Sequence, residues 1–342
     1  PGTVSVSAAV GLLTWGLIKA GEEGWSSAMV VGSLVAAAIM FAVFIAIEQR
    51  VERPMVPLGL FRSRMFTGAN ITALIVAFLI SGLAFTGTMY FQNVHDYSPI
   101  ESGLTMLPMV AVMMIMSPIT GGLIGRVQIR TLILIGLLIT GSGALFWLRA
   151  SVDASYWTVL PAMMLVGLGN SFLFAPMTTG VMNSVPAAQV GVGSAVNGAV
   201  RETGFAFGVA VLGAIANQAY NDSFSKSGEI ASLRQQDGGA LQPVVDLVGN
   251  SINYAGNWIR SIEEFQQLPA PVTDTLDAVS SQAYVDGMHA AFIITGLLTV
   301  VAAFGTWLLI GPDQPSTRPA EAEVEEPRFS SQTGMAAGPV GE

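Results

Sequence analysis

The residues best suited to chemistry lie in the stretch NGAVRETGFAFG, residues 197–208, where Asn197, Arg201 and Glu202 interrupt a long apolar run. A charge at the centre of a bilayer costs about 2.5–3.5 kcal/mol on insertion scales, so such residues normally face a bundle interior and mark a pathway. Asn197 and Arg201 are four residues apart and share a helix face. Arg201 and Glu202 point about 100° apart, so each needs a partner elsewhere. A carboxylate at this depth could take up and release a proton.

The depth of these charges leaves two interpretations open. Fourteen uncharged residues run from Thr203 to Ala216, roughly 21 Å of helix against a hydrocarbon core of about 30 Å. The span must then reach back past Glu202, which places both charges within the core boundary. If the helix instead continues to Tyr220, Arg201 reaches the headgroups and snorkels. Glu202 is shorter, snorkels less well, and is the better candidate for protonation.

The composition explains which elements must hold these residues. Of 342 residues, 52% are hydrophobic and 11% are charged, against roughly 25% charged in soluble domains. The mean hydropathy is +0.60. We therefore expect an all-α, polytopic integral membrane protein. The chain has no cysteine and only two histidines, which argues against a metal site, and we expect no cofactor. A net charge of −9 argues against a nucleic-acid partner.

Eight stretches are long and apolar enough to cross a bilayer. They lie near residues 2–20, 26–47, 69–91, 102–125, 131–149, 156–182, 190–218 and 288–311. The loops on one side carry Arg50, Arg53, Arg62, Arg64, Arg126 and Arg130, and the short loops on the opposite side carry only Lys19 and Arg149. By the positive-inside rule the six-arginine side is cytoplasmic, so both ends of the chain are expected in the cytoplasm.

The domain organisation follows from these spans. We expect two linker helices and a cytoplasmic loop over 1–68, a six-helix transport domain over 69–311, and a disordered cytoplasmic tail over 312–342. A polar loop over 219–287 is expected on the outer side. The chain begins at Pro1 in an apolar segment, without Met or a basic stretch before it. We interpret this start as a truncation and expect no signal peptide.

Several residues in the spans favour close helix packing or bending. Gly204 and Gly208 form a GxxxG pair, which lets helices approach closely. Pro108, Pro118 and Pro176 favour kinks. A bundle that rocks would use both features, but any polytopic bundle uses small residues in this way.

Met106, Met109, Met113 and Met116 share one face of the fourth span. Such a stripe suits varied ligands or simply fills a core or faces lipid. Phosphate-binding loops, HExxH and nucleophile elbows are absent, so we do not expect an enzyme.

The order of these pieces resembles the major facilitator superfamily, and within it the fourteen-helix drug:proton antiporters of multidrug efflux and antibiotic resistance. The resemblance rests on VERPMVPLGLFRSRMF (51–66), YFQNVHDYSPIESGLTMLPM (90–109), SPITGGLIGRVQIR (117–130), LPAMMLVGLGNSFLFAPM (160–177) and VPAAQVGVGSAVNGAVRETGFAFGVAVLG (185–213). It implies that the eight spans are two linker helices plus a C-terminal six-helix half-bundle, and that the N-terminal half of the same transporter is missing.

The segment GGLIGRVQIR is similar to the family's cytoplasmic glycine–basic loop, with Gly121, Leu123, Arg126 and Arg130 matching. Gly125 stands where the family has an acidic residue, and Gln128 where it has glycine. The resemblance implies that the acidic residue helps to pair helix ends between transport states, and this chain lacks that residue in this loop.

The resemblance implies proton-coupled export of hydrophobic or cationic compounds across a bacterial cytoplasmic (inner) membrane. The pathway residues would be Asn197, Arg201 and Glu202, with Gln92 and Asn170 as weaker candidates. Substrate would sit near the bilayer midplane between two halves that rock. The partners expected are the lipid bilayer, a small substrate, protons, the missing half and, as an open alternative, a periplasmic adaptor. Export of a sugar, siderophore or lipid precursor, or a non-transporting membrane scaffold, remain alternatives.

Overall fold

The computed structural model describes residues 2–51, 54, 56–236, 241–256, 265 and 268–310. The expected disordered tail over 312–342 and Arg53 of the cytoplasmic loop lie outside these described residues. Within them the chain is helical, apart from turns and one isolated bridge between Ile124 and Val127.

Eight helical spans long and apolar enough to cross a membrane are present in the part of the chain that the structure describes, which confirms the expected all-α polytopic fold class. They are formed by α1 (Gly2–Glu23), α2 (Ala28–Glu48), α3 (Arg64–Asn93), α4 (Pro99–Thr105) with α5 (Leu107–Leu123), α6 (Ile129–Phe146) with η2 (Trp147–Arg149), α7 (Tyr156–Asn183), η3 (Ala187–Gln189) with α8 (Val190–Lys226), and α12 (Ala270–Leu309). The short helices η1 (Leu58–Arg62), α9 (Gly228–Gln236), α10 (Gln242–Asn250) and η4 (Ile252–Tyr254) connect them.

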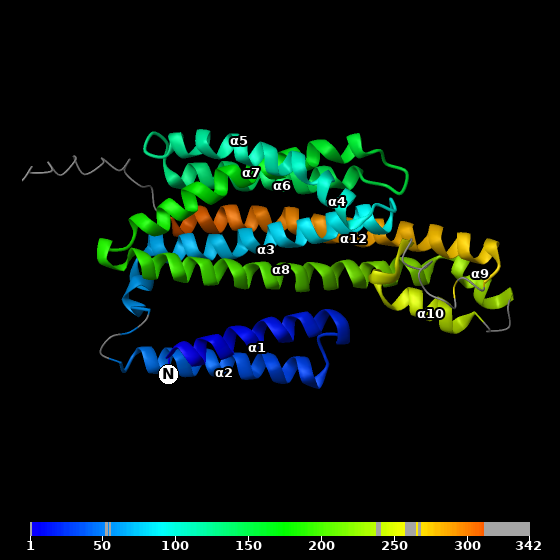
Figure 1. Ribbon diagram of the computed structural model, residues 1–342, viewed down its shortest axis with the longest axis horizontal. Helices are drawn as coiled ribbons and strands as arrows, with labels where there is room; N and C mark the ends of the chain where they lie inside the picture. The colour runs from blue at the N-terminus through cyan, green and yellow to red at the C-terminus, as the bar shows by residue number, and fades with distance from the viewer. Residues whose placement is uncertain are drawn as a thin grey trace, which may run out of the picture.

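The spans run side by side, with the hairpin of α1 and α2 lying along one side of the bundle formed by the other spans (Figure 1). Within the bundle α3 packs on α8 and α12, α7 packs on α5 and α6, and α12 also packs on α6 and α8. The hairpin of α1 and α2 reaches the bundle through α1, which contacts α8. The contacts of α3 with α8 and α12 therefore join the first helix of the six-helix region to its last two.

Two helices are longer than a bilayer requires. α8 has 37 residues and α12 has 40, roughly 56 and 60 Å of helix against a hydrocarbon core of about 30 Å. Both extend beyond the other spans on the side where α9 and α10 lie (Figure 1). The expectation of one loop over 219–287 was therefore wrong at both ends, where residues 219–226 and 270–287 are helical. These segments are too polar for a hydropathy criterion to detect.

Local sequence explains where the fourth span begins and breaks. Ser98 caps α4, and its side chain and Glu101 form a reciprocal capping box. The span breaks at Met106, and Pro108 lies in the first turn of α5, where a missing amide proton costs nothing. The break divides the fourth span into two helices.

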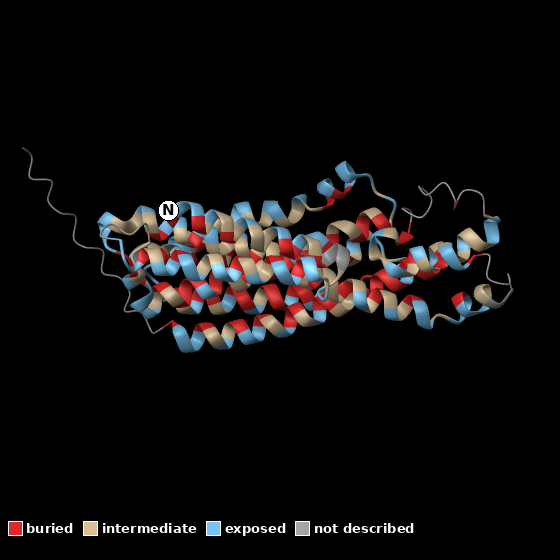
Figure 2. Cartoon of the chain, turned by 90° about the horizontal axis from the view of Figure 1, so that it is seen from below, coloured by how far each residue is buried: buried red, intermediate tan, exposed pale blue. Residues whose placement is uncertain are grey.

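The core is uneven along and around the bundle. Buried residues gather on the inward faces of the helices (Figure 2). Half of the most apolar window of α3, α6 and α7 is buried, whereas 6% of that window is buried in the fourth span. α5 exposes Val110, Met114, Ile115 and Ile119. One side of the half-bundle is therefore an apolar surface that none of the described residues covers.

Candidate functional site

The bundle has two chemically different ends. We call the end that carries Arg62, Arg64, Arg126 and Arg130 the basic end, and the end where α3 finishes and α7 begins the aromatic end. The candidate pathway residues are distributed along the axis between them. Their depth follows from helix length, at 1.5 Å of rise per residue.

A buried pair of asparagines joins α3 to α8 in the half nearer the basic end. Asn197 Nδ2 donates to Asn70 Oδ1 at 3.2 Å, and Asn70 Nδ2 donates to the Phe66 carbonyl at 2.9 Å. Asn197 is 5% and Asn70 3% exposed. An amide pair of this kind is stable in an apolar interior only because each group satisfies the other. Sequence reasoning selected Asn197 and missed Asn70.

Arg201 follows one turn further along α8, roughly 16 Å from the start of that helix. Its Cζ lies 4.7 Å from the ring centroid of Phe174 on α7, a cation–π distance. Its Nε is buried and makes no hydrogen bond to any residue the structure describes. The expectation that Arg201 needs a partner other than Glu202 is met by an aromatic ring. The charged side chain thus extends from α8 to α7 and has no acidic partner among the described residues.

The remaining predicted pathway residues are not gathered at this point. Glu202 is exposed on α8 and makes no ion pair with the described residues. Asn170 is 2% exposed, its Oδ1 lacks a described partner, and it lies one turn before Phe174 on the same face of α7. Gln92 is half-buried near the aromatic end of α3, about 33 Å along the helix from Asn70. Assignment of these residues to a transport pathway stays a prediction.

Close glycine contacts fix the α3–α8 seam that holds the asparagine pair. A Cβ at Gly204 would overlap the Leu74 carbonyl oxygen, and one at Gly208 would overlap that of Phe78. Gly167 on α7 meets the Met109 carbonyl of α5 in the same way. Backbone packs directly on backbone at these positions, which leaves no room for adjustment at the seam.

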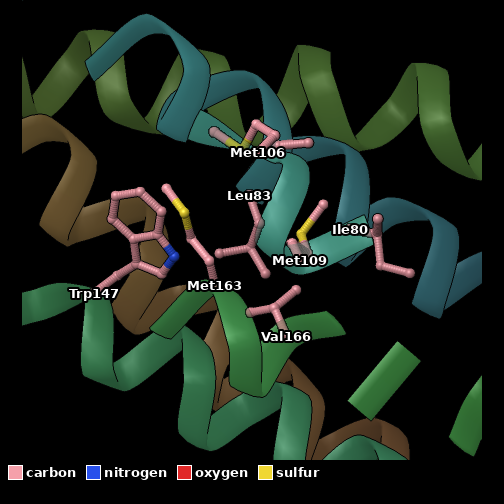
Figure 3. Close-up of a pocket in the computed structure, with 8 residues that line it drawn as sticks. Ile80, Leu83, Met106, Met109, Trp147, Met163 and Val166 are labelled. Carbon is pink, nitrogen blue, oxygen red and sulfur yellow. The ribbon is translucent and has the colours of Figure 1, made fainter. Parts of the chain in front are cut away.

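Methionines enclose a small cavity where the fourth span breaks. Met106 and Met109 point into it together with Met163 and Trp147 (Figure 3). The cavity holds about 20 Å³, close to the volume that one water requires, and its lining is almost wholly apolar, with the indole of Trp147 the only polar side chain among the residues that line it. It is too small for a substrate in this conformation.

Two of the predicted bending residues lie inside helices. Pro118 lies inside α5 and Pro176 inside α7, each where its ring removes a helical hydrogen bond.

The glycine–basic loop makes a tight turn at the basic end. Gly125 has φ +92°, a conformation that favours glycine, and it stands where the family has an acidic residue. Arg126 is exposed, while Arg130 Cζ lies 5.0 Å from the Trp307 ring of α12. Gly121 has open space around it. The first turn of α6, which follows this loop, therefore contacts α12 through Arg130.

Sequence reasoning missed the polar centre of the aromatic end. The Tyr90 hydroxyl donates to the Ser151 carbonyl at 2.7 Å and lies 2.9 Å from His95 Nε2. Burial lowers the pKa of His95, and Asp96 and Asp153 oppose that effect. His95 stacks edge-on with Tyr90 at 4.8 Å between ring centroids. The signal available was YFQNVHDY, residues 90–97, with three aromatics around a single histidine.

Together, the eight spans and the pairwise packing define a polytopic α-helical membrane bundle. The profile of the Major Facilitator Superfamily matches residues 2–209, and the chain belongs to that superfamily. This confirms the family resemblance drawn from the sequence, and with it the expectation of a transporter family instead of an enzyme.

Several curated relatives of the chain are named for drug resistance or multidrug transport. It is 30% identical over 307 residues to the tetracenomycin C resistance and export protein of Streptomyces glaucescens, covering 88% of this chain and 54% of that protein. It is 37% identical over 207 residues to the multidrug resistance protein Stp of Mycobacterium tuberculosis, covering 60% and 38%. MdtP, a multidrug transporter of Bacillus subtilis, is 24% identical over 307 residues, covering 89% and 57%. The chain thus spans about half, or less, of the length of these relatives.

A solved structure shares the fold. The bacterial homologue of the human lysosomal transporter Spinster, in an inward-facing and occupied conformation, superposes with a TM-score of 0.52 at 17% identity, covering 84% of this chain and 57% of that one. This likeness concerns the fold alone.

Proposed function

We propose that the protein containing this chain is a secondary active exporter of hydrophobic or cationic compounds in a bacterial cytoplasmic membrane, driven by proton influx. The relatives named for drug resistance and export support export of drug-like compounds. The uncovered apolar side of α5 supports a second half-bundle that completes the pathway. In this arrangement the basic end faces the cytoplasm, as does each end of the chain.

The observation that carries the proposal is Arg201, a charge well inside α8 that contacts Phe174 of α7 and has no acidic partner among the described residues. A charge held this deep is expensive and is normally retained for a pathway. Asn70 and Asn197 fix the helix that carries it. Gln92 and Asn170 would line the same route closer to the aromatic end.

Glu202 is the residue proposed to exchange ions. Its carboxylate, exposed on α8, would bind either a proton or a cationic compound, because both compete for the same oxygens. Competition of this kind couples the inward movement of one to the outward movement of the other. Gly204 and Gly208 would keep α8 and α3 together as one rigid unit during rocking, and Pro118 and Pro176 would let their helices bend.

The test is efflux of ethidium by the complete gene product in cells that lack other exporters. Glu202→Gln is expected to lose most proton-dependent efflux, since the amide cannot ionise. Glu229→Gln, on the exposed surface of α9, is the matched control and should behave as the unmodified protein does. Efflux by Glu202→Gln at unchanged rates across pH and substrates would refute this role.

A further inference from the structure

A large cleft separates the α1–α2 hairpin from the bundle near the basic end. Its volume is about 770 Å³, within the range of about 300–1,000 Å³ of small-molecule sites. The lining comes from both helices of the hairpin, the segment around η1, and α8. The lining residues are Val6, Phe41, Phe44, Ile45, Val56, Leu58, Phe61, Gly191, Val192, Ala195, Val196, Ala199 and Val200.

The lining chemistry selects a hydrocarbon occupant. Each of the thirteen lining residues is apolar, so water inside would lack the polar partners it requires. A void of this size would forfeit the van der Waals contacts of its whole lining. The cleft lies between two membrane-spanning elements, where the surrounding medium is lipid. An acyl chain can fill it without losing hydrogen bonds.

The shape of the cleft comes from a mismatch of side-chain size. Gly191, Ala195 and Ala199 repeat every four residues and form one row on α8. Phe41 and Phe61 are among the larger side chains that line the cleft from the hairpin and η1. The row leaves α8 without side chains long enough to reach the hairpin here. Ala195 and Ala199 are exposed as a result.

Two arginines lie close in the chain to residues that line the cleft. Arg62 directly follows the lining residue Phe61, and Arg50 follows α2 beyond Ile45. Both arginines are exposed and neither forms an ion pair with a residue the structure describes. The nearby carboxylate of Glu48 is buried and accepts from the Val56 amide at 2.9 Å. Exposed guanidinium groups on the segments that adjoin an apolar cleft suit an anionic phosphate attached to acyl chains.

We propose that an anionic glycerophospholipid occupies this cleft, with an acyl chain between the hairpin and α8 and its phosphate at Arg50 and Arg62. The lipid completes the packing between the hairpin and the bundle, which otherwise meet through the α1–α8 contact. The site is separate from the Asn70–Asn197 seam and does not depend on the proposed export activity.

The experiment is native mass spectrometry of the full-length protein in mild detergent, titrated with phosphatidylglycerol or with phosphatidylcholine of the same acyl chains. The unmodified protein should retain phosphatidylglycerol preferentially. Arg50→Gln and Arg62→Gln should each weaken phosphatidylglycerol retention roughly fivefold, and the double variant should treat both lipids alike. These substitutions are on the surface and leave folding intact.

A cleft-filling variant tests the acyl-chain part. Ala195→Phe with Ala199→Phe should lose retention of both lipids, because the added rings occupy the acyl chain's space. Val300→Phe, 61% exposed on α12 and outside the cleft, is the control and should retain lipid normally. Equal retention of the two lipids by the unmodified protein, no retention at all, or undiminished retention by the filled variant would each overturn the proposal.

Discussion

The two ends of the bundle are held together by different interactions. At the aromatic end one continuous hydrophobic cluster joins α3, α7, α8, α10 and α12. Two buried tyrosine hydroxyls add hydrogen bonds between elements: Tyr284 donates to the Thr86 carbonyl at 3.0 Å, and Tyr220 donates to the Val248 carbonyl at 2.9 Å. Nearer the basic end the buried clusters are smaller. There the contacts between α8 and its neighbours include the asparagine pair and the Arg201–Phe174 contact.

This difference indicates which end is easier to open. Local stability follows the number of buried apolar contacts and satisfied long-range hydrogen bonds. The aromatic end has both, whereas the basic end has the large cleft beside α8. We therefore expect that opening the aromatic end requires more free energy than opening the basic end. The basic end should change first when the bundle moves.

The largest expected effect is a truncation within the aromatic cluster. Trp147 is 3% exposed and packs against Tyr90, Phe91 and Phe292. Trp147→Ala should lower the free energy of unfolding by about 3–5 kcal/mol through the cavity it leaves. Trp157→Ala is the control, since Trp157 is 74% exposed, and it should change stability by about 0.5 kcal/mol or less. Denaturant unfolding in micelles measures both, and equal effects would remove the contrast between a packed and an exposed tryptophan.

A glycine pair on α8 gives the next effect. Gly208→Ala should cost roughly 1–3 kcal/mol, because the new methyl group meets the Phe78 carbonyl of α3. Gly198→Ala points into open space on the same helix and should stabilise it by about 0.5–1 kcal/mol through helix propensity. Thermal melting of both variants checks the opposite signs; a destabilised Gly198→Ala would show that the open space is filled in the membrane.

The asparagine seam should show a coupling between its two residues. Asn70→Leu or Asn197→Leu alone leaves the other amide buried without its partner and should cost about 1–3 kcal/mol. The double variant should cost less than the sum, with a coupling of up to about 1.7 kcal/mol, the upper range measured between membrane helices. Additive losses in this double-mutant cycle would mean that the hydrogen bond between the two amides contributes nothing.

The smallest effect is a pH dependence at His95. Its folded pKa lies below the ordinary 6.5 because burial disfavours the charged ring, although Asp96 and Asp153 oppose this. The unfolded chain then binds more protons below pH 6.5, so stability should fall as the pH drops through that value. His95→Gln should flatten the melting temperature between pH 7 and 5. An unchanged slope in that variant would assign the pH dependence to other groups.

Hydropathy alone predicted the eight spans, because twenty apolar residues in a row have few alternatives to a membrane helix. It missed the ends of α8 and α12, which continue as amphipathic helices beyond the bilayer. The spacing of Tyr220 and Phe224, and of Val279 and Ala283, carried that signal.

The contact partners of the candidate site residues could not be predicted from the sequence. Asn70 is 127 positions from Asn197, and no local pattern connects Arg201 to Phe174. A single asparagine in an apolar span indicates that its side chain has a hydrogen-bond partner, but the sequence does not identify that partner. Only the packing of α3 and α7 against α8 supplies those contacts.

The most direct test of the central claim is the accessibility of Glu202 in the complete gene product. These 342 residues contain no cysteine. With any cysteine elsewhere in the gene product replaced by serine, a single Glu202→Cys variant can be probed with a charged, water-soluble thiol reagent. The proposed exporter predicts rapid labelling, slowed by bound substrate, and no labelling of Val300→Cys, which lies on an exposed apolar face of α12. A Glu202→Cys variant as unreactive as Val300→Cys would place this residue in lipid and contradict its role in the transport pathway.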